Sequence, residues 1–175
     1  DIMLNKIKAE EITLNTSSGD IHAKNSAAER SLSIHSLSGD MMLNDIKAEN
    51  MQVEVTSGNM FISNTKTKSL ALSSASGDVQ LNDVTGNIAV DNISGDIFIK
   101  KDELDGNMKI HSTSGDIDIQ LKKDPQSLAL NYEGISGEGD VLINGMNFEE
   151  KSDHRIKGKI GKGDLIIDVS TSSGD

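Results

Sequence analysis

The fold is decided by residues 76–95, which read SGDVQLNDVTGNIAVDNISG. Two stretches within it, Val79-Gln80-Leu81 and Ile88-Ala89-Val90, place apolar residues at every second position. Successive side chains of a β-strand point to opposite sides, so each stretch predicts a strand with one buried side. Gly77 and Gly95 bound the unit, where a turn needs backbone conformations that β-branched residues resist. Residues 83 and 84 are the predicted corner between the two strands.

The same unit recurs along most of the chain. A Ser-Gly-Asp or Ser-Gly-Asn tripeptide and a following apolar residue return every 18 to 20 residues as far as Ile117, and looser copies follow at Gly139-Asp140-Val141 and Gly163-Asp164-Leu165. A fixed period in this range is typical of a solenoid, whose coils each contact their neighbours. The sequence therefore predicts an all-β fold, a single-stranded parallel β-helix with eight to nine coils of 18–24 residues. We expect it to be right-handed, because parallel crossovers almost always are.

Stacked coils would place like residues above one another. The first strands predict an inward column of Ile2, Ile21, Met41, Met60, Val79, Ile97, Ile117, Val141 and Leu165, and beside it one from Leu4 to Ile99, Ile119, Ile143 and Ile167. The second strands predict inward columns that run from Ile12 to Met108 and Leu128 and from Leu14 to Ile110 and Leu130. Apolar residues near the corners, among them Ile7, Leu37, Ala75 and Ile93, are also expected to point inward. The hydrophilic stretches 122–126 and 149–155 are expected to loop out at a corner.

Composition limits the classes of partner. The 175 residues carry a net charge of −11, which argues against nucleic acid and anionic membranes, because both are bound by neutralising phosphates. The chain has no cysteine, and His22 and His154 are isolated and lack metal-ligand spacing, so we expect no metal site and no cofactor. It is expected to form one domain of a longer protein, which would contact a membrane only through segments outside this chain.

The repeat also resembles a known family. Ser-Gly-Asp-Ile at residues 94–97 and 114–117, interleaved with Gly86-Asn87-Ile88 and Gly106-Asn107-Met108, is similar to a bacterial β-strand-repeat domain that carries an adhesin label and has no known function. The resemblance spans essentially the whole chain and implies a β-helix. It further implies a bacterial envelope protein with a role in surface attachment or envelope stress, and it implies no catalytic residues.

One candidate feature is a ladder of acidic residues after the turn glycines. It comprises Asp20, Asp40, Asn59, Asp78, Asp96, Asp116, Asp140 and Asp164. Like charges about 5 Å apart repel unless hydrogen bonds or a cation satisfy them. We expect each aspartate to cap its own turn. Calcium, which favours carboxylate and carbonyl oxygens, is the alternative, although the repeat length does not match known calcium-binding loops.

A second column contains serine, aspartate and histidine on successive coils: Ser73, Asp91 and His111. A catalytic triad needs histidine between serine and the carboxylate, but here Asp91 separates the other two. The column therefore predicts a solvated ladder, and no catalytic residue is assigned.

Two groups remain as candidate binding surfaces. The outward column of the first strands holds apolar residues where polar ones are expected, and its predicted members are Met3, His22, Met42, Phe61, Gln80, Phe98, Asp118, Leu142 and Ile166. The candidate binding residues in it are Met42, Phe61, Phe98, Leu142 and Ile166, with Met42 next to Phe61 and Leu142 next to Ile166. Exposed apolar patches tend to mark interaction sites. The second group is a basic patch on an otherwise acidic chain, formed by Lys151, Arg155, Lys157, Lys159 and Lys162, which could hold an anionic partner.

These features together favour a non-enzymatic structural or interaction module of the bacterial cell envelope. Its partner would be a protein or a cell surface, and it could associate with itself through the apolar column or through uncapped ends. The expected location is the envelope or the cell exterior, with the cytoplasmic face of the membrane as the alternative. The other function class is a β-helix enzyme or binding protein for polysaccharide, with calcium as a possible requirement.

Overall fold

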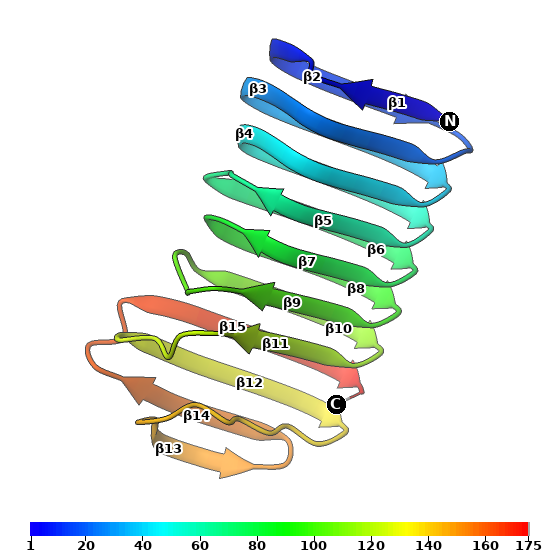
Figure 1. The fold of residues 1–175 in the computed structure, drawn as a ribbon. Helices are drawn as coiled ribbons and strands as arrows, with labels where there is room; N and C mark the ends of the chain where they lie inside the picture. Colours follow the sequence, from blue (N-terminus) through cyan, green and yellow to red (C-terminus); the bar gives the residue numbers. More distant parts are fainter. Residues whose placement is uncertain (175) are drawn as a thin grey trace.

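The computed structural model describes residues 1–174, which form β-strands wound into a parallel β-solenoid (Figure 1). The strands are β1 (Ile2–Asn5), β2 (Lys8–Thr16), β3 (Ile21–Ser38), β4 (Met41–Ser57), β5 (Met60–Thr65), β6 (Ser69–Ser76), β7 (Val79–Val84), β8 (Asn87–Ser94), β9 (Ile97–Lys101), β10 (Met108–Ser114), β11 (Ile117–Leu121), β12 (Leu128–Ser136), β13 (Asn147–Ser152), β14 (Arg155–Ile160) and β15 (Leu165–Ser173). Within these residues, no helix has the length and apolar character that a membrane span requires.

The solenoid has two long faces. The front face comprises β1, the first parts of β3 and β4, and β5, β7, β9 and β11; the back face begins with β2, the second parts of β3 and β4, and β6, β8 and β10. In Figure 1 the strands in front run from right to left, and the fainter ones return behind them as the chain descends. This sense of winding is right-handed, as predicted.

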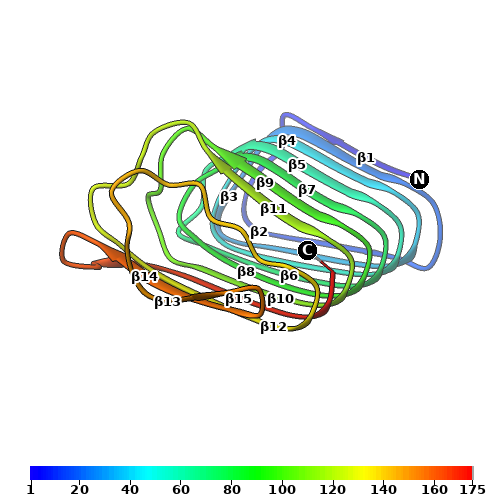
Figure 2. The same cartoon turned by 90° about the horizontal axis from the view of Figure 1, so that it is seen from below.

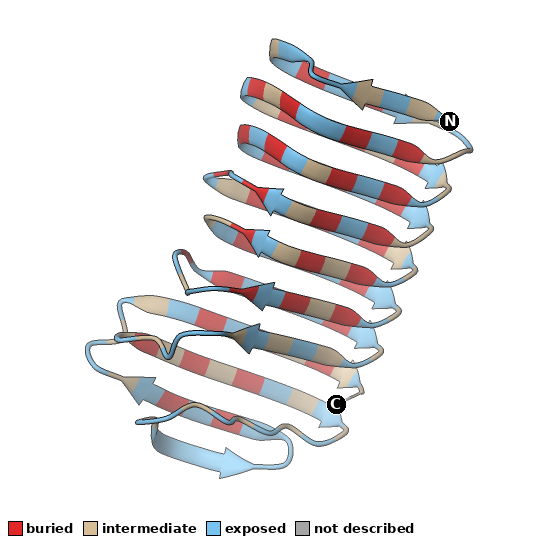
Figure 3. Ribbon diagram, in the orientation of Figure 1, coloured by how far each residue is buried: buried red, intermediate tan, exposed pale blue. Residues whose placement is uncertain are grey.

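Like residues stack on like residues through about six regular turns. Val79 pairs with Met60 on one side and Ile97 on the other, and Ile88 pairs with Leu70 and Met108 in the same way. All these ladders are parallel, which confirms the predicted stacking. Figure 3 shows the resulting alternation of buried and exposed residues along each strand.

The core is a thin aliphatic layer between the two faces (Figure 2). Four of its front-face residues, Leu43, Ile62, Leu81 and Ile99, have 0% exposure. In the regular coils, aliphatic side chains in identical positions pack at the strand spacing of about 4.8 Å and fill the interior, whereas Tyr132 of β12 adds an aromatic ring to the core near its end.

The corner before the turn differs from the prediction. Leu37 and Ile93 are 61% and 56% exposed, whereas Ser36 and Asn92 beside them are buried. The back-face strands stay extended up to the turn, so the alternation that buries Ile34 also turns Ser36 inward and Leu37 outward. Ala75 is half-buried, and Ile7 is 41% exposed because it lies on the first coil. At this corner the alternation of side chains along the strand, and not their polarity, decides which residues are buried.

The last part of the chain does not continue the stack as predicted, so eight to nine coils are not formed. On the back face β15 lies between β10 and β12, and the order beyond β10 is β15, β12, β14, β13. Ile167 pairs with Met108, and Leu165 with Leu128, so both belong to the back face rather than to the front-face columns. Leu128 and Leu130 are likewise separated from β10 by β15. Val141 and Ile143 lie in a segment without strand structure.

The two hydrophilic stretches behave differently from each other. Residues 122–126 form a loop between β11 and β12, as expected. Residues 149–155 are not a loop: they form most of β13, the turn at Asp153 and His154, and the first residue of β14 in an antiparallel hairpin. The alternation around Ile156, which is buried while both its neighbours are exposed, explains why this segment forms a strand.

Candidate functional site

The turn glycines are required by geometry. Gly58 and Gly77 have φ values of 139° and 126°, a region that side-chain-bearing residues rarely adopt. A Cβ atom on either glycine would lie 2.2 Å from the carbonyl oxygen of the turn glycine one coil earlier. The coils therefore approach each other at this corner as closely as backbone permits.

The five side chains from Asp20 to Asp96 that follow these glycines form a continuous ladder, and each caps the turn of the next coil rather than its own. The Asp96 amide donates to Oδ1 of Asp78 at 2.9 Å, and the Asp116 amide donates to Oδ1 of Asp96 at 2.9 Å. Asn59 takes the same part, since its Oδ1 accepts the Asp78 amide at 3.0 Å. The prediction that each aspartate caps its own turn is therefore wrong for these residues, and it holds at Asp140, whose Oδ1 accepts the Val141 amide at 2.8 Å. One oxygen of each side chain is committed to a backbone amide.

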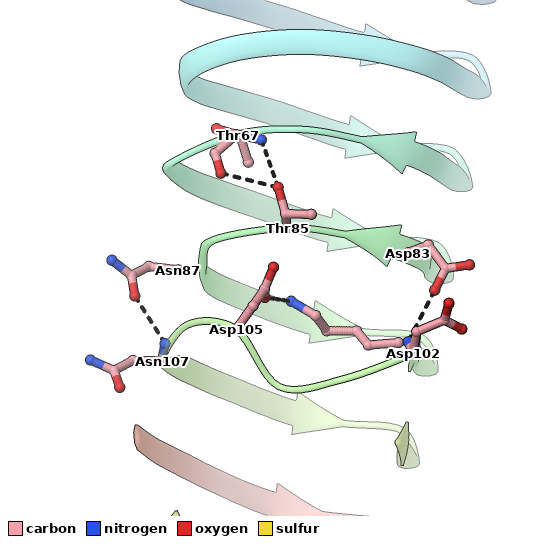
Figure 4. Close-up of polar contacts among 8 residues, drawn as sticks. Thr67, Asp83, Thr85, Asn87, Asp102, Asp105 and Asn107 are labelled. Carbon is pink, nitrogen blue, oxygen red and sulfur yellow. Dashed lines mark hydrogen bonds and ion pairs between the residues drawn. The ribbon is translucent and has the colours of Figure 1, made fainter. Parts of the chain in front are cut away.

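The opposite corner uses the same chemistry (Figure 4). Asp83 has a φ of 51°, in the left-handed region where aspartate and asparagine are tolerated, and its Oδ1 accepts the Asp102 amide at 3.1 Å. Further along, Oδ1 of Asn87 accepts the Asn107 amide at 2.9 Å. The predicted corner at residues 83 and 84 is confirmed. Both edges of the solenoid are therefore held by side-chain-to-backbone ladders.

Two lysine–aspartate pairs lie near this corner. Lys101 is buried, at 3% exposure, and its Nζ meets Oδ1 of Asp105 at 2.5 Å (Figure 4). On the surface, Lys122 donates to Asp102; this hydrogen bond and the lysine's charge lower the pKa of Asp102, and they raise the pKa of Lys122.

The outward column of the front face forms as predicted over its first seven members. The register joins Met3, His22, Met42, Phe61, Gln80, Phe98 and Asp118 on successive strands. Met42 is 50% exposed and Phe61 is 41% exposed, and the two are direct neighbours. Phe98 lies two strands further along and is half-buried. We call Met42, Phe61 and Phe98 the apolar column.

Leu142 and Ile166 lie elsewhere and do not form the predicted adjacent pair. Leu142 is 91% exposed in the irregular segment between β12 and β13. Ile166 is on β15 of the back face, where it pairs with Ala129. The insertion of β15 between two back-face strands removes both residues from the front-face register.

The basic residues gather on the β13–β14 hairpin. Arg155, Lys157 and Lys159 project from the same side of β14, because they occupy alternate positions. Lys151 is on β13, and Lys162 is in the turn before β15. Acidic residues lie among them. Arg155 Nη2 lies 3.1 Å from Glu133 Oε1, Lys151 Nζ lies 3.5 Å from Asp140 Oδ1, and Lys157 is the cross-strand neighbour of Glu150. The patch is therefore partly neutralised locally.

The polar column on the back face contains an arrangement that the sequence reasoning missed. Asp91 separates Ser73 from His111, as predicted. The insertion of β15, however, brings Ser170 next to His111, and Nδ1 of His111 lies 2.9 Å from Oγ of Ser170. The sequence did carry a signal, since residues 167–174 and 108–115 share one pattern that ends in Ser-Gly.

A shallow trough of about 400 Å³ lies on the same face near the turn. Its lining includes Leu37, Ile93, Ser73 and the pair His35 and Glu54, whose Nδ1 and Oε2 atoms are 2.8 Å apart. It therefore combines polar side chains with the apolar residues that alternation turns outward.

Within residues 1–174, no group of three or more histidine, aspartate, glutamate or cysteine side chains is placed to hold a metal ion. From Asp20 to Asp96, one oxygen of each ladder side chain accepts a backbone amide of the next coil. Further along, Oδ1 of Asp140 accepts the Val141 amide, and Oδ2 of Asp164 accepts the Ser127 hydroxyl.

Comparison with known proteins agrees with this architecture. Searches of curated proteins and of solved structures find none that matches the chain. The profile of the Toastrack DUF4097 family, a domain family without an assigned function, matches residues 1–175. The chain, a parallel β-solenoid stacked by glycine and aspartate ladders, therefore belongs to the Toastrack DUF4097 family.

Proposed function

We propose that this domain is a non-enzymatic interaction scaffold of the bacterial cell envelope, adhesin-like or linked to envelope stress. The observation that supports this function best is the apolar column. Met42 and Phe61 are neighbours on the ladder and remain 50% and 41% exposed, on a strand face whose other side is fully buried. Exposed apolar neighbours on a rigid surface are typical of a protein contact.

The solenoid preorganises this column. Every strand that carries it is fixed by parallel ladders on both sides and by the aspartate caps at the turn, so the side chains stand at intervals of about 4.8 Å. A partner that covers Met42 and Phe61 would gain about 1 kcal/mol from each, because roughly half of each side chain is still exposed. Little ordering entropy would oppose this gain.

The partner in this proposal is a protein or a cell-surface component, or a second copy of the chain. The location is the envelope or the cell exterior, with the cytoplasmic face of the membrane as the alternative. The net charge of −11 disfavours nucleic acid and anionic lipid as direct ligands.

A second candidate function is polysaccharide binding or cleavage. The trough on the back face supports it, because the pair His35 and Glu54 lies beside the exposed side chains of Leu37 and Ile93. Polar groups next to apolar surface suit the two sides of a sugar ring. This candidate predicts saccharide binding that is lost when Glu54 is replaced.

The experiment that tests the scaffold function measures co-sedimentation of the purified domain with bacterial envelope fragments. Replacing Met42, Phe61 and Phe98 with threonine should reduce the bound fraction at least fivefold. The matched control replaces Gln52, Ala71 and Ala89, which point outward from the back face, with threonine and should bind like the original protein. Equal binding of the two variants would reject the apolar column as the contact.

A polysaccharide-cleavage assay, with and without calcium, separates the two functions. The scaffold function predicts no turnover in either condition. Turnover that disappears in Glu54→Gln would replace it with the polysaccharide function.

A further inference from the structure

The front face ends at β11, and one edge of this strand is open. β11 pairs with β9 alone among the strands of residues 1–174. In a parallel ladder a residue directs both its N–H and its C=O to one neighbour, and the next residue directs them to the other. The Lys122 amide donates to the Lys101 carbonyl on the β9 side. The backbone groups of Ile119 and Leu121 therefore point to the open edge.

A cavity of about 690 Å³ lies beneath this edge. Ile119 and Leu121 line one wall, Tyr132 and Val169 of the back face line another, and Val141 and Ile143 lie across the opening. Ile119 is only half-buried, whereas Ile99, its neighbour one coil earlier, has 0% exposure. No backbone hydrogen bond within the described chain joins residues 140–144 to β11. The volume is within the range of about 300–1,000 Å³ that ligand pockets have.

Acidic side chains predominate around the cavity, and Lys151 Nζ lies 3.5 Å from one of them, Asp140. Its lining includes five carboxylates and, within residues 1–174, no lysine or arginine; the carboxylates are Asp116, Asp118, Asp124, Glu138 and Asp140. Asp118 projects outward from the middle of β11, in the position where a cross-strand neighbour would meet it. The charge of the site therefore favours an occupant with positive side chains.

The shape of this end argues against a second copy as the occupant. On the back face, β12, β14 and β13 extend beyond β15, whereas the front face stops at β11 (Figure 1). A flush stack would place β1 and β2 of another copy on both faces at once, and the overhang of the back face blocks the position of β2. A single extended strand can enter under the overhang.

We propose that the open edge of β11 binds an extended basic peptide as an added parallel strand. Its apolar side chains, at alternate positions, would fill the cavity beside Ile119 and Leu121. Its lysine or arginine side chains, at the positions between, would point outward and pair with Asp118. Backbone hydrogen bonds to an open edge give affinity, and the alternating side chains give selectivity. This site is separate from the apolar column and does not depend on it.

The test uses two synthetic seven-residue peptides, acetylated and amidated, in which valine alternates with lysine or with glutamate. Fluorescence anisotropy should show at least tenfold tighter binding of the lysine peptide, and its affinity should fall as salt rises. Asp118→Asn keeps the shape and the acceptor for Gln120, whose Nε2 lies 2.8 Å from Asp118 Oδ2, and should weaken binding about two- to fivefold. Equal binding of the two peptides would overturn the proposal.

A backbone variant tests the strand addition itself. Ile119→Pro removes a donor that faces the open edge, where proline is tolerated, and should abolish binding. Ile119→Val is the matched control and should keep the affinity within about threefold. Unchanged binding by the proline variant would refute strand addition, as would failure of the valine control to bind. The threonine variant of the apolar column should bind the lysine peptide normally, which separates this test from that of the proposed function.

If Ile119→Pro does not fold, amide hydrogen exchange of the original protein decides the question. The amides of Ile119 and Leu121 should exchange quickly in the free protein and slow at least tenfold with saturating lysine peptide. No slowing would contradict the proposal. Amides already protected in the free protein would show that the segment around Val141 has paired with β11, which also contradicts it.

Discussion

Replacement of Asp96 tests the aspartate ladder in depth, because this residue is flanked by Asp78 and Asp116. Its Oδ1 accepts the Asp116 amide at 2.9 Å, and its own amide donates to Asp78. Asp96→Ala removes the acceptor and should cost about 1 kcal/mol, as capping side chains do. Asp96→Asn keeps an acceptor in the same place, as Asn59 does naturally.

Both variants also remove charge repulsion. Two carboxylates about 4.8 Å apart in water repel by about 0.9 kcal/mol, and physiological salt reduces this to about 0.5 kcal/mol. Loss of two such neighbours should stabilise each variant by about 1 kcal/mol at 0.15 M salt and by about 0.3 kcal/mol at 1 M. Asp96→Asn should therefore be more stable than the original protein at low salt, and Asp96→Ala about equal to it.

Urea unfolding of the two variants at both salt concentrations is the assay. The free energies of unfolding of Asp96→Asn and Asp96→Ala should differ by about 1 kcal/mol in each, because the difference isolates the hydrogen bond. Equal stabilities of the two variants would refute the capping ladder. A stabilisation of Asp96→Asn relative to the original protein that stays the same at 1 M salt would contradict the charge repulsion.

Three further substitutions test other parts of the solenoid. Gly77→Ala should destabilise the fold by about 2 kcal/mol or more in urea unfolding, since the new Cβ would lie 2.2 Å from a backbone oxygen of the previous coil. Gly145→Ala, which has open space around the new Cβ, should cost about 1 kcal/mol. Equal losses of stability in the two variants would exclude the close approach of the coils at Gly77. Ser74→Ala should leave the melting temperature unchanged or raise it, because the buried Ser74 Oγ has no hydrogen-bond partner within the described residues. A clear fall in the melting temperature would contradict this reasoning. Lys122→Met should raise the pKa of Asp102 toward its ordinary value, and NMR titration can measure this change. Because the pKa of Asp102 is lowered in the folded protein, the stability that the pair contributes is present above the unfolded pKa and is lost as pH falls through the folded pKa. An unchanged pKa in the variant would contradict the pairing.

The regular coils could be predicted from the sequence because the apolar pattern of the strands and the glycines of the turns both repeat at the same interval. Apolar residues at every second position fix which side of a strand is buried, and glycine fixes where the chain turns. Val79 and Ile97 occupy the same place in successive repeats, so their contact follows directly from the period. The same alternation should also have corrected the prediction for Leu37, since Ile34 is inward and Leu37 is an odd number of positions away.

The order of the final strands could not be read from the period. Sequence order suggests that β12 follows β10, but β15 takes this position because residues 167–173 match the back-face pattern of β10 more closely and end in the same turn. Two strands that are far apart in sequence pair when that pairing is more stable than the alternatives, and the local pattern of each strand does not show which pairing is the most stable. The contact between His111 and Ser170, and the separation of Leu142 from Ile166, both follow from this exchange.

The central claim is parallel, in-register stacking, and spin-label distances along one outward column of the back face test it most directly. With one label at Thr13, the second would be placed at Ala71, Ala89, Lys109 and Asp168, which are three to six strands away in the observed pairing. The account predicts distances that rise by about 4.8 Å per strand, from about 14 Å at Ala71 to about 29 Å at Asp168. Distances that alternate between near and far, or a label at Asp168 nearer than the one at Lys109, would contradict it.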